Sequence, residues 1–177
     1  MVGYARKGFL RLITGRVDTD FLTARNMLTQ RTVCPTCSGS VSIDISHLKD
    51  GDISGLGLLQ KNYGLVAIKV EDNQREIIMV NAGSGKPEIV QTLPVKQAVV
   101  YFKAECDFRN RKDIAYFFYS LDNRNWQPIG TALKMSYTLP HFMGYRYALF
   151  NYSTKTSGGF ADFDFFHIQD QLTEPGK

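Results

Sequence analysis

Ser40-Val-Ser-Ile-Asp-Ile-Ser46 alternates polar and apolar residues along its whole length. Because successive side chains of a β-strand point to opposite faces, Val41, Ile43 and Ile45 share one face, and the serines and the aspartate share the other. This is the pattern of a half-buried strand in an antiparallel sheet. Lys49-Asp-Gly-Asp52 follows with turn chemistry, so the strand is expected to end there.

Similar short segments recur on both sides of this stretch, separated by turn residues. They are predicted as strands at residues 9–13, 55–60, 63–71, 75–80, 88–93, 97–106, 114–121, 126–129, 145–152 and 160–168. About a dozen short strands, with turns roughly every 8 to 12 residues, predict an all-β fold: a two-sheet antiparallel β-sandwich of the jelly-roll type. The helices we expect are short and lie around residues 20–26 and 134–137.

Length and composition agree with one domain. At 177 residues the chain is near the size at which a single hydrophobic core forms, so we predict one β-sandwich over residues 1–177, with loose ends at 1–8 and 169–177. Since 44% of the residues are apolar, a core can form without disulfides or metals, and no cofactor is required. The formal charge of +4 is carried by scattered Lys and Arg, which excludes the basic stripe of a nucleic-acid-binding protein.

The sequence contains no membrane-spanning or signal-like segment. No apolar run approaches the roughly 20 residues that cross a bilayer, and the first residues lack an apolar signal core, so we expect a soluble chain with no membrane partner. Strand-like residues follow the initiating Met closely, which suggests a piece of a longer protein. Its localisation therefore stays open, cytoplasmic or secreted according to that protein.

The three cysteines do not form a recognisable metal or redox motif. Cys34-Pro-Thr-Cys37 has no second ligand pair downstream to complete a zinc site, since Cys106 is the one further cysteine. The motif also precedes an alternating strand, whereas a redox pair opens a helix. We expect small buried or half-buried thiols, with a disulfide or a redox role as the alternative.

The last predicted strand carries two carboxylates on one face, Asp162 and Asp164. The opposite face is aromatic: Phe163, Phe165 and His167. The two carboxylates could accept hydrogen bonds from the backbone or from Arg, or form part of a calcium site completed by other oxygens. A glycosidase acid and base would also fit this spacing, but they need two opposite environments, which nothing in the sequence indicates. We therefore do not predict catalysis by this pair.

The chain contains the aromatic and amide side chains that proteins use to bind sugars, in which aromatic faces stack on pyranose rings and polar groups bind hydroxyls. Trp126, the one Trp of the chain, follows a polar turn and either packs in a hairpin or forms a sugar platform. Tyrosines on alternating strands could form a concave platform: Tyr101, Tyr116, Tyr145 and Tyr147. The candidate carbohydrate-binding residues are Arg31, Gln60, Asn62, Tyr63, Trp126, Tyr145, Arg146 and Asn151.

Other catalytic arrangements are not indicated. His47, His141 and His167 lie in unrelated contexts, and a histidine needs positioned partners before it becomes a base or a ligand. Gly83-Ser-Gly-Lys86 lacks the spacing and the following helix of a phosphate-binding loop, so it indicates a turn.

Four stretches resemble one known family. They are Ala24-Arg-Asn-Met-Leu-Thr-Gln-Arg-Thr32 running on to Asp52, residues 57–69, Gly144-Tyr-Arg-Tyr-Ala-Leu-Phe-Asn151 and Gly158-Gly-Phe-Ala-Asp-Phe-Asp-Phe-Phe166. They are similar to the concanavalin A-like β-sandwich that follows the catalytic propeller in family 43 glycoside hydrolases, the β-xylosidases and α-arabinofuranosidases. In that family the catalytic carboxylates lie on the five-bladed propeller, so the resemblance implies that this chain is not an enzyme by itself.

The resemblance also implies partners. In family 43 β-xylosidases the sandwich packs on the propeller and extends a loop that helps to close the active-site pocket, so we expect the propeller, and xylan or arabinoxylan oligosaccharides, as partners. Arg31 and Arg146 lie in the matching stretches; they either contact sugar or propeller, or pair with Asp44, Asp52 or Asp162.

A different class of function stays open, namely a structural or protein-interaction sandwich without a glycan site, in which all aromatic residues are core. An exposed apolar patch would favour propeller docking, and an aromatic groove lined by amides would favour glycan binding.

Overall fold

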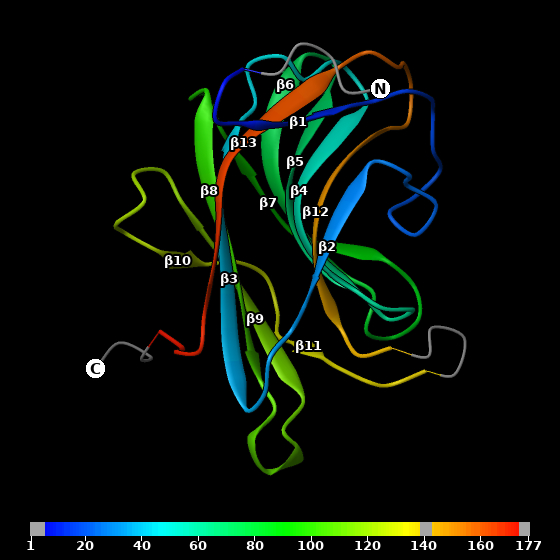
Figure 1. Cartoon of the computed structure of the whole chain (residues 1–177). Coiled ribbons are helices and arrows are strands. Elements are labelled where there is room, and N and C mark those ends of the chain that lie inside the picture. The colour runs from blue at the N-terminus through cyan, green and yellow to red at the C-terminus, as the bar shows by residue number, and fades with distance from the viewer. Residues whose placement is uncertain (1–5, 139–142, 174–177) are drawn as a thin grey trace.

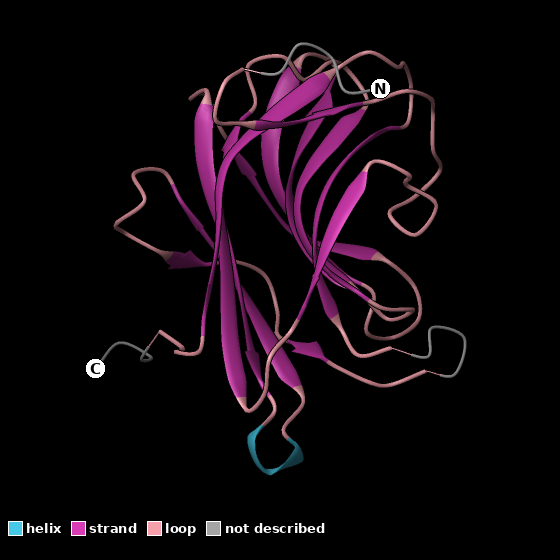
Figure 2. Cartoon of the chain, viewed as in Figure 1, coloured by secondary structure: helices cyan, strands magenta, loops and turns pink. Residues whose placement is uncertain are grey.

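Two antiparallel β-sheets face each other in the computed structural model, which describes residues 6–138 and 143–173. Figure 2 shows the strands of both sheets joined by loops, with one short 3-10 turn, Arg109–Arg111, and no α-helix in the described residues. Within these ranges there is no helix long and apolar enough to cross a membrane.

Each sheet mixes strands from distant parts of the chain (Figure 1). Sheet A has the order β1 (Leu10–Ile13), β13 (Phe160–Gln169), β3 (Thr36–Asp44), β8 (Val99–Asp107), β9 (Ile114–Ser120), β10 (Gln127–Pro128), and β11 (Leu133–Lys134) also pairs with β9. Sheet B has the order β2 (Met27–Arg31), β12 (Arg146–Ser153), β4 (Asp52–Leu59), β5 (Gly64–Glu71), β6 (Gln74–Asn81), β7 (Glu88–Pro94). This confirms the predicted two-sheet antiparallel sandwich.

The main core lies between the sheets. Val41, Ile43 and Ile45 are fully buried there, as the alternation predicted. Phe102 of β8 and Tyr147 of β12 meet them from both sheets and are also fully buried. Burial of such large apolar side chains is the dominant favourable contribution to folding.

The two predicted helices are wrong. Residues 21–23 form a turn and residues 24–26 are irregular, because the Asp20 carboxylate accepts the backbone N–H groups of Leu22 at 2.7 Å and Thr23 at 3.0 Å and so closes a local turn. Residues 133–134 pair with β9 as β11, opposite Ile114 and Ala115. The short strands β2 and β11 were not predicted.

The face assignment along 160–168 is also wrong beyond Phe163. The pairing of β13 with β3 shifts between Phe163 and Phe166, because β13 contains one extra residue there, a β-bulge. Phe163 therefore faces the core, whereas Phe165 stacks between Tyr101 and His167, with ring centroids 6.3 Å and 4.4 Å apart.

Parts of the predicted loose ends contact sheet A. Arg6 donates to the Asp44 carboxylate at 3.0 Å, and the backbone N–H of Thr173 donates to Glu105 at 3.0 Å. The other end residues, 1–5 and 174–177, lie outside the described residues. The boundaries 1–177 of a single domain stay a prediction.

Candidate functional site

A second apolar cluster covers the outer face of sheet B, apart from the core between the sheets. It consists of Phe21, Tyr63, Leu65, Ala67, Ile78, Ala82, Ala148, Phe150 and Tyr152. At its centre Phe21, from the loop 14–26, is fully buried, and its ring centroid lies 4.8 Å from those of Tyr63 and Phe150. All nine side chains are at most 7% exposed, so the candidate contact surface is the part of this face that lies open beside the Phe21 loop and not the cluster itself.

A groove of about 200 Å³ opens on this face beside the Phe21 loop. Its lining residues are Thr19, Asp20, Ile53, Tyr63, Leu65, Lys69, Ile78, Val80, Pro87, Ile89, Tyr152 and Thr154. Most of them are apolar or aromatic, and Ile89 on β7 is 50% exposed. The groove is therefore suited to apolar side chains of a partner more than to a densely hydroxylated ligand.

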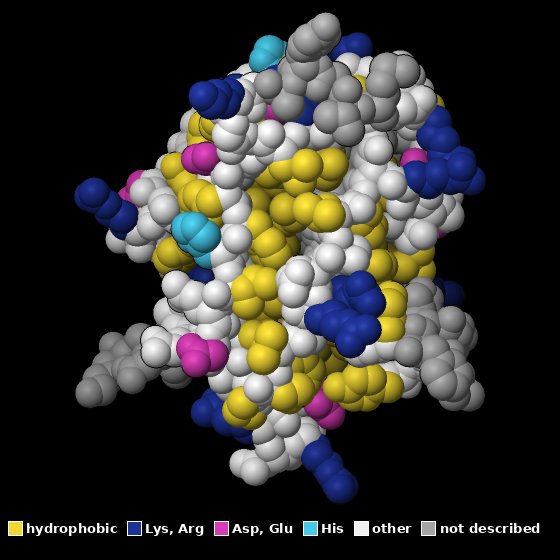
Figure 3. Space-filling model, in the orientation of Figure 1, with side chains coloured by type: hydrophobic (Ala, Val, Ile, Leu, Met, Phe, Trp, Pro, Cys, Tyr) yellow, Lys and Arg dark blue, Asp and Glu magenta, His cyan; other side chains and the backbone are white. Residues whose placement is uncertain are grey.

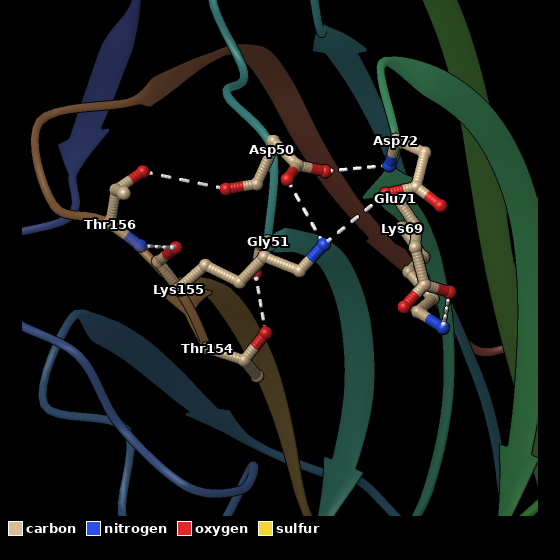
Figure 4. A network of polar contacts seen from close by, with 9 residues as sticks. Asp50, Gly51, Lys69, Glu71, Asp72, Thr154, Lys155 and Thr156 are labelled. Carbon is tan, nitrogen blue, oxygen red and sulfur yellow. Dashed lines mark hydrogen bonds and ion pairs between the residues drawn. The ribbon is translucent and has the colours of Figure 1, made fainter.

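A polar network fixes one rim of the groove (Figure 4). Lys155 forms ion pairs with Asp50 at 3.0 Å and Asp72 at 3.7 Å, and Asp50 also accepts the backbone N–H of Asp72 at 2.7 Å. Thr154, which lines the groove, donates its hydroxyl to the Gly51 carbonyl at 3.1 Å. The hydrogen bond from Lys155 lowers the pKa of the Asp50 carboxyl. The network joins the loops that follow β3, β5 and β12.

The outer face of sheet A carries a second candidate surface. The Lys103 ammonium lies 4.7 Å from the ring centroid of Phe118 and 4.8 Å from that of Trp126, and it forms a 3.0 Å ion pair with Glu105. A small pocket of about 160 Å³ lies beside this pair, lined by Ser38, Lys103, Glu105, Gln169, Gln171, Leu172 and Thr173. Tyr116, 44% exposed, extends the aromatic surface.

Two predicted sugar-binding residues, Gln60 and Tyr145, lie inside the fold instead of on a surface, and a third, Asn62, is half-buried. Gln60, fully buried, donates its amide to the Met143 carbonyl at 2.7 Å. The Tyr145 hydroxyl, on a side chain 1% exposed, donates to the Asn62 carbonyl at 2.6 Å, and the Asn62 amide donates to the Ser136 hydroxyl at 3.1 Å. These residues hold the two ends of the connection between β11 and β12.

The other predicted residues are dispersed. Asn151 is fully buried and donates to the Leu12 carbonyl at 2.7 Å, and Tyr63 packs under Phe21 in the cluster on sheet B. Trp126 is half-buried on sheet A. Arg31 and Arg146 are brought together, directly opposite each other on β2 and β12. The eight residues therefore do not form one site, and their contact with sugar stays a prediction.

The predicted tyrosine platform is wrong as a single surface. Tyr145 and Tyr147 lie in the core between the sheets, whereas Tyr101 and Tyr116 lie on sheet A, where neighbouring strands pair them with Ser120 and Glu105. The sequence did not predict the apolar outer face of sheet B. The signal was present, because residues 63–70 form a nearly continuous apolar run, which is typical of a strand covered on both faces.

Asp162 is held by Arg11. The Arg11 Nε and Nη2 atoms donate to its two carboxylate oxygens, each at 2.7 Å, and Asp162 is 3% exposed while Asp164 is exposed. The described residues contain no group of three or more His, Cys, Asp or Glu placed to hold a metal ion. Calcium at Asp162 and Asp164 stays a prediction: chelator should then lower the melting temperature, and an unchanged value would count against the metal.

The expected pairing of Arg31 or Arg146 with an aspartate is wrong, since each of the three aspartates has another partner. Asp44 binds Arg6, Asp162 binds Arg11, and Asp52 accepts the backbone N–H of Lys49 at 2.7 Å. Burial raises the pKa of the Asp52 carboxyl.

Two of the three free cysteines are buried as expected, and Cys34 is exposed. Cys37 and Cys106 lie directly opposite each other on β3 and β8, and the Tyr147 hydroxyl donates to Cys37 Sγ at 3.2 Å. A hydrogen bond from Cys106 lowers the pKa of Cys37 to about 6, whereas burial raises the pKa of Cys106. Cys34 is exposed, and the described residues place no group of three or more His, Cys, Asp or Glu around the cysteines; the lack of a zinc site stays a prediction.

The buried tyrosines predict a loss of stability at alkaline pH. Burial raises the pKa of Tyr63 to about 12 and also raises the pKa values of Tyr147 and Tyr152. The phenol of Tyr63 ionises near pH 10 in the unfolded chain and near pH 12 in the folded chain. The stability that the neutral, buried phenol contributes is therefore fully present below pH 10 and is lost as the pH rises towards 12. We expect the melting temperature to fall over this range, and to fall less in Tyr63→Phe. An identical fall in both proteins would contradict the assignment to Tyr63.

Known proteins share this architecture. The sequence profile of the β-xylosidase C-terminal concanavalin A-like domain matches residues 3–169. A curated β-xylosidase of Formosa agariphila is 24% identical over 150 residues, which are 84% of this chain and 24% of that protein.

Solved structures agree with the profile. A bifunctional family 43 hydrolase and carbohydrate esterase of Bacteroides eggerthii is 58% identical with a TM-score of 0.94, over 96% of this chain and 22% of that one. A family 43 hydrolase engineered to display endo-xylanase and exo-arabinofuranosidase activity is 26% identical with a TM-score of 0.86, over 92% of this chain and 34% of that one.

This chain therefore spans between about a fifth and a third of the length of these relatives. The profile covers almost all of its residues, and the sandwich it describes is the one observed. The chain belongs to the family of β-xylosidase C-terminal concanavalin A-like domains, the accessory domains of family 43 glycoside hydrolases.

Proposed function

We propose that this chain docks on the catalytic propeller of a family 43, xylan-degrading hydrolase through the outer face of sheet B, and that it cleaves no glycosidic bond itself. The observation that carries this proposal is the groove beside the second apolar cluster, whose mostly apolar lining includes Ile89, 50% exposed on the outer face of sheet B. Such a face is expected where a domain packs against a neighbour.

The surroundings of the groove support docking on a large partner. Its apolar lining continues to Ile89, which is half exposed on the last strand of sheet B, and Thr154 and Lys155 link its rim to Gly51 and Asp50. A preorganised surface loses less conformational entropy on binding. Relatives with this sandwich are about three to four times as long as this chain, so most of such a protein lies outside the sandwich.

Docking predicts a strong effect of one surface substitution. In Ile89→Glu a charge replaces an exposed apolar side chain at the groove, and the fold should be unaffected because β7 is an edge strand. We expect binding to the separately expressed catalytic part of the Bacteroides eggerthii protein to weaken at least about tenfold, because a charge would be desolvated at the interface without a partner. Isothermal titration calorimetry measures the change.

The matched control is Leu121→Glu, which places the same charge directly after β9 of sheet A, also at an exposed position, 48%. This variant should bind as the unmodified chain does. Equal weakening by both substitutions, or by neither, would contradict docking through sheet B.

A second candidate function is binding of xylan-type carbohydrate on the outer face of sheet A. It is favoured by the half-buried Trp126 and the exposed Tyr116, which neighbour Lys103 and Glu105 of the small polar pocket. Since Trp126 is the one Trp, its fluorescence should change on titration with xylo-oligosaccharides or arabinoxylan if sugar stacks there. An unchanged spectrum with every ligand would remove this candidate.

The absence of intrinsic catalysis is also a proposal. Asp162 has both oxygens bound by Arg11, so the pair Asp162 and Asp164 lacks a free acid in a sugar-sized cleft. The purified chain should release no sugar from an aryl β-xyloside, and release that disappears in Asp164→Ala would refute this.

A further inference from the structure

Two like charges face each other on the outer face of sheet B. Arg31 of β2 is the direct partner of Arg146 of β12, two positions from Ala148, whose side chain belongs to the apolar cluster on this face. Because residues two apart in a strand share a face, the two guanidinium groups lie on the proposed docking side. Like charges directly opposite each other on neighbouring strands are destabilising unless a partner offsets them.

Neither arginine has a carboxylate partner in the part of the chain that the structure describes. Arg31 is exposed and forms none of the ion pairs found there, and Arg146 makes one long hydrogen bond, from Nη1 to the Thr29 hydroxyl at 3.4 Å. The Arg146 Nε atom is shut off from solvent without an acceptor. A buried donor without an acceptor is rare in native proteins, which points to a group that is missing from the isolated chain.

The missing group has the chemistry of a carboxylate. Arginine presents a planar set of N–H donors that fits two carboxylate oxygens, and two arginines side by side attract an anion more strongly than one. An aspartate or glutamate side chain placed between Arg31 and Arg146 would remove the repulsion between them and supply acceptors for their free N–H groups.

The position of the pair indicates where this carboxylate comes from. Leu59, the other strand partner of Arg146, packs against the apolar cluster. Leu28 on β2, 53% exposed, lies on the opposite face of the strand, opposite Leu149, at the edge of the sandwich. Figure 3 shows apolar side chains gathered along the open edge between the two sheets, with Lys or Arg beside them at the lower end of β2. Apolar surface next to charges without partners is the composition of a protein interface.

We propose that Arg31 and Arg146 form a receptor for an acidic side chain of the catalytic part of the protein. This inference rests on the proposed docking through sheet B and adds the chemistry of the partner: an aspartate or glutamate next to apolar residues. The pair sets the orientation of docking, because an ion pair of fixed geometry discriminates against other arrangements.

Calorimetric titration of the catalytic part of the Bacteroides eggerthii protein with Arg31→Ala and Arg146→Ala tests this. Each variant should bind roughly tenfold or more weakly than the unmodified chain, and its affinity should depend less on salt concentration. The double variant should lose less than the two single losses combined, because both residues contact one carboxylate. Arg124→Ala, an exposed arginine on the turn after β9, is the control and should bind normally.

The melting temperatures of the isolated variants provide a second readout. If Arg31 had a structural ion pair within this chain, Arg31→Ala would melt earlier; the proposal predicts an unchanged or higher value, because a like-charge contact is removed. Normal docking by both alanine variants would overturn the inference and leave the docking proposal standing. No docking by the unmodified chain would instead refute the proposed function.

A polysaccharide carboxylate is the competing source of the anion. Xylo-oligosaccharides that carry glucuronic acid are therefore titrated into the same proteins. The proposal predicts no binding that depends on Arg31 or Arg146; binding that both alanine variants abolish would assign the pair to the polysaccharide and overturn the proposal.

Discussion

Gly55→Ala is expected to destabilise the domain by about 3 kcal/mol, a large loss for the addition of one methyl group. A Cβ atom at Gly55 would lie 2.2 Å from the Val66 carbonyl oxygen and 2.6 Å from the Ala67 Cα atom. Both are backbone atoms of the paired strand β5, so relief requires β4 and β5 to separate. Urea denaturation followed by circular dichroism measures the difference.

Gly15→Ala is the matched control. An added Cβ at Gly15 meets no atom within 4 Å, so this variant should unfold at the same urea concentration as the unmodified protein. If both variants unfolded at the same urea concentration, the close approach of β4 and β5 would not be a constraint on the fold.

Arg11→Ala should cause the second large loss of stability. It leaves the Asp162 carboxylate, 3% exposed, without the guanidinium that binds both its oxygens. It also removes the contact between the Arg11 guanidinium and the Phe160 ring, 3.9 Å from the ring centroid. A buried charge that loses its one strong partner is a recognised cause of severe destabilisation. Thermal unfolding should show a much lower melting temperature.

Two variants make this prediction specific. Arg11→Ala combined with Asp162→Ala should recover part of the loss, since the double change removes the unpaired charge as well. Arg6→Ala breaks the exposed ion pair with Asp44 and should be nearly neutral. If Arg6→Ala and Arg11→Ala lowered the melting temperature equally, the buried ion pair of Asp162 would contribute no more stability than the exposed ion pair of Asp44.

The strands were predictable because their signal is local. Alternation at 40–46 and apolar runs such as 63–71 correspond to β3 and β5 within a few residues. β2 was missed because Met27–Arg31 is a short edge strand whose residues do not alternate clearly. The turn at Asp20 and the bulge after Phe163 depend on hydrogen bonds that residue periodicity does not encode.

The candidate site was harder to predict than the fold. Gln60 and Asn151 carry amides of the kind common on surfaces, but Gln60, directly after β4, and Asn151, on β12, are fully buried and bond to backbone carbonyls of distant segments. Arg31 and Arg146 were correctly singled out by residue type, whereas their direct opposition follows from the pairing of β2 with β12, which joins residues more than 100 positions apart. Sheet order is a long-range property, so sequence patterns alone could not show this contact.

Docking through the outer face of sheet B accounts for two features together: the apolar groove beside the Phe21 loop, and the arginines on β2 and β12 that have no carboxylate partner among the described residues. A sandwich that acted alone would leave both without a partner. The groove is expected to lose contact with water only when the proposed catalytic partner is present.

Hydrogen–deuterium exchange tests this central claim most directly, with the chain measured alone and in complex with the catalytic part of the Bacteroides eggerthii protein. The account predicts new protection in the Phe21 loop and in β2, β6 and β7, with no change around Trp126 on sheet A. Protection confined to sheet A, or none in the saturated complex, would contradict it.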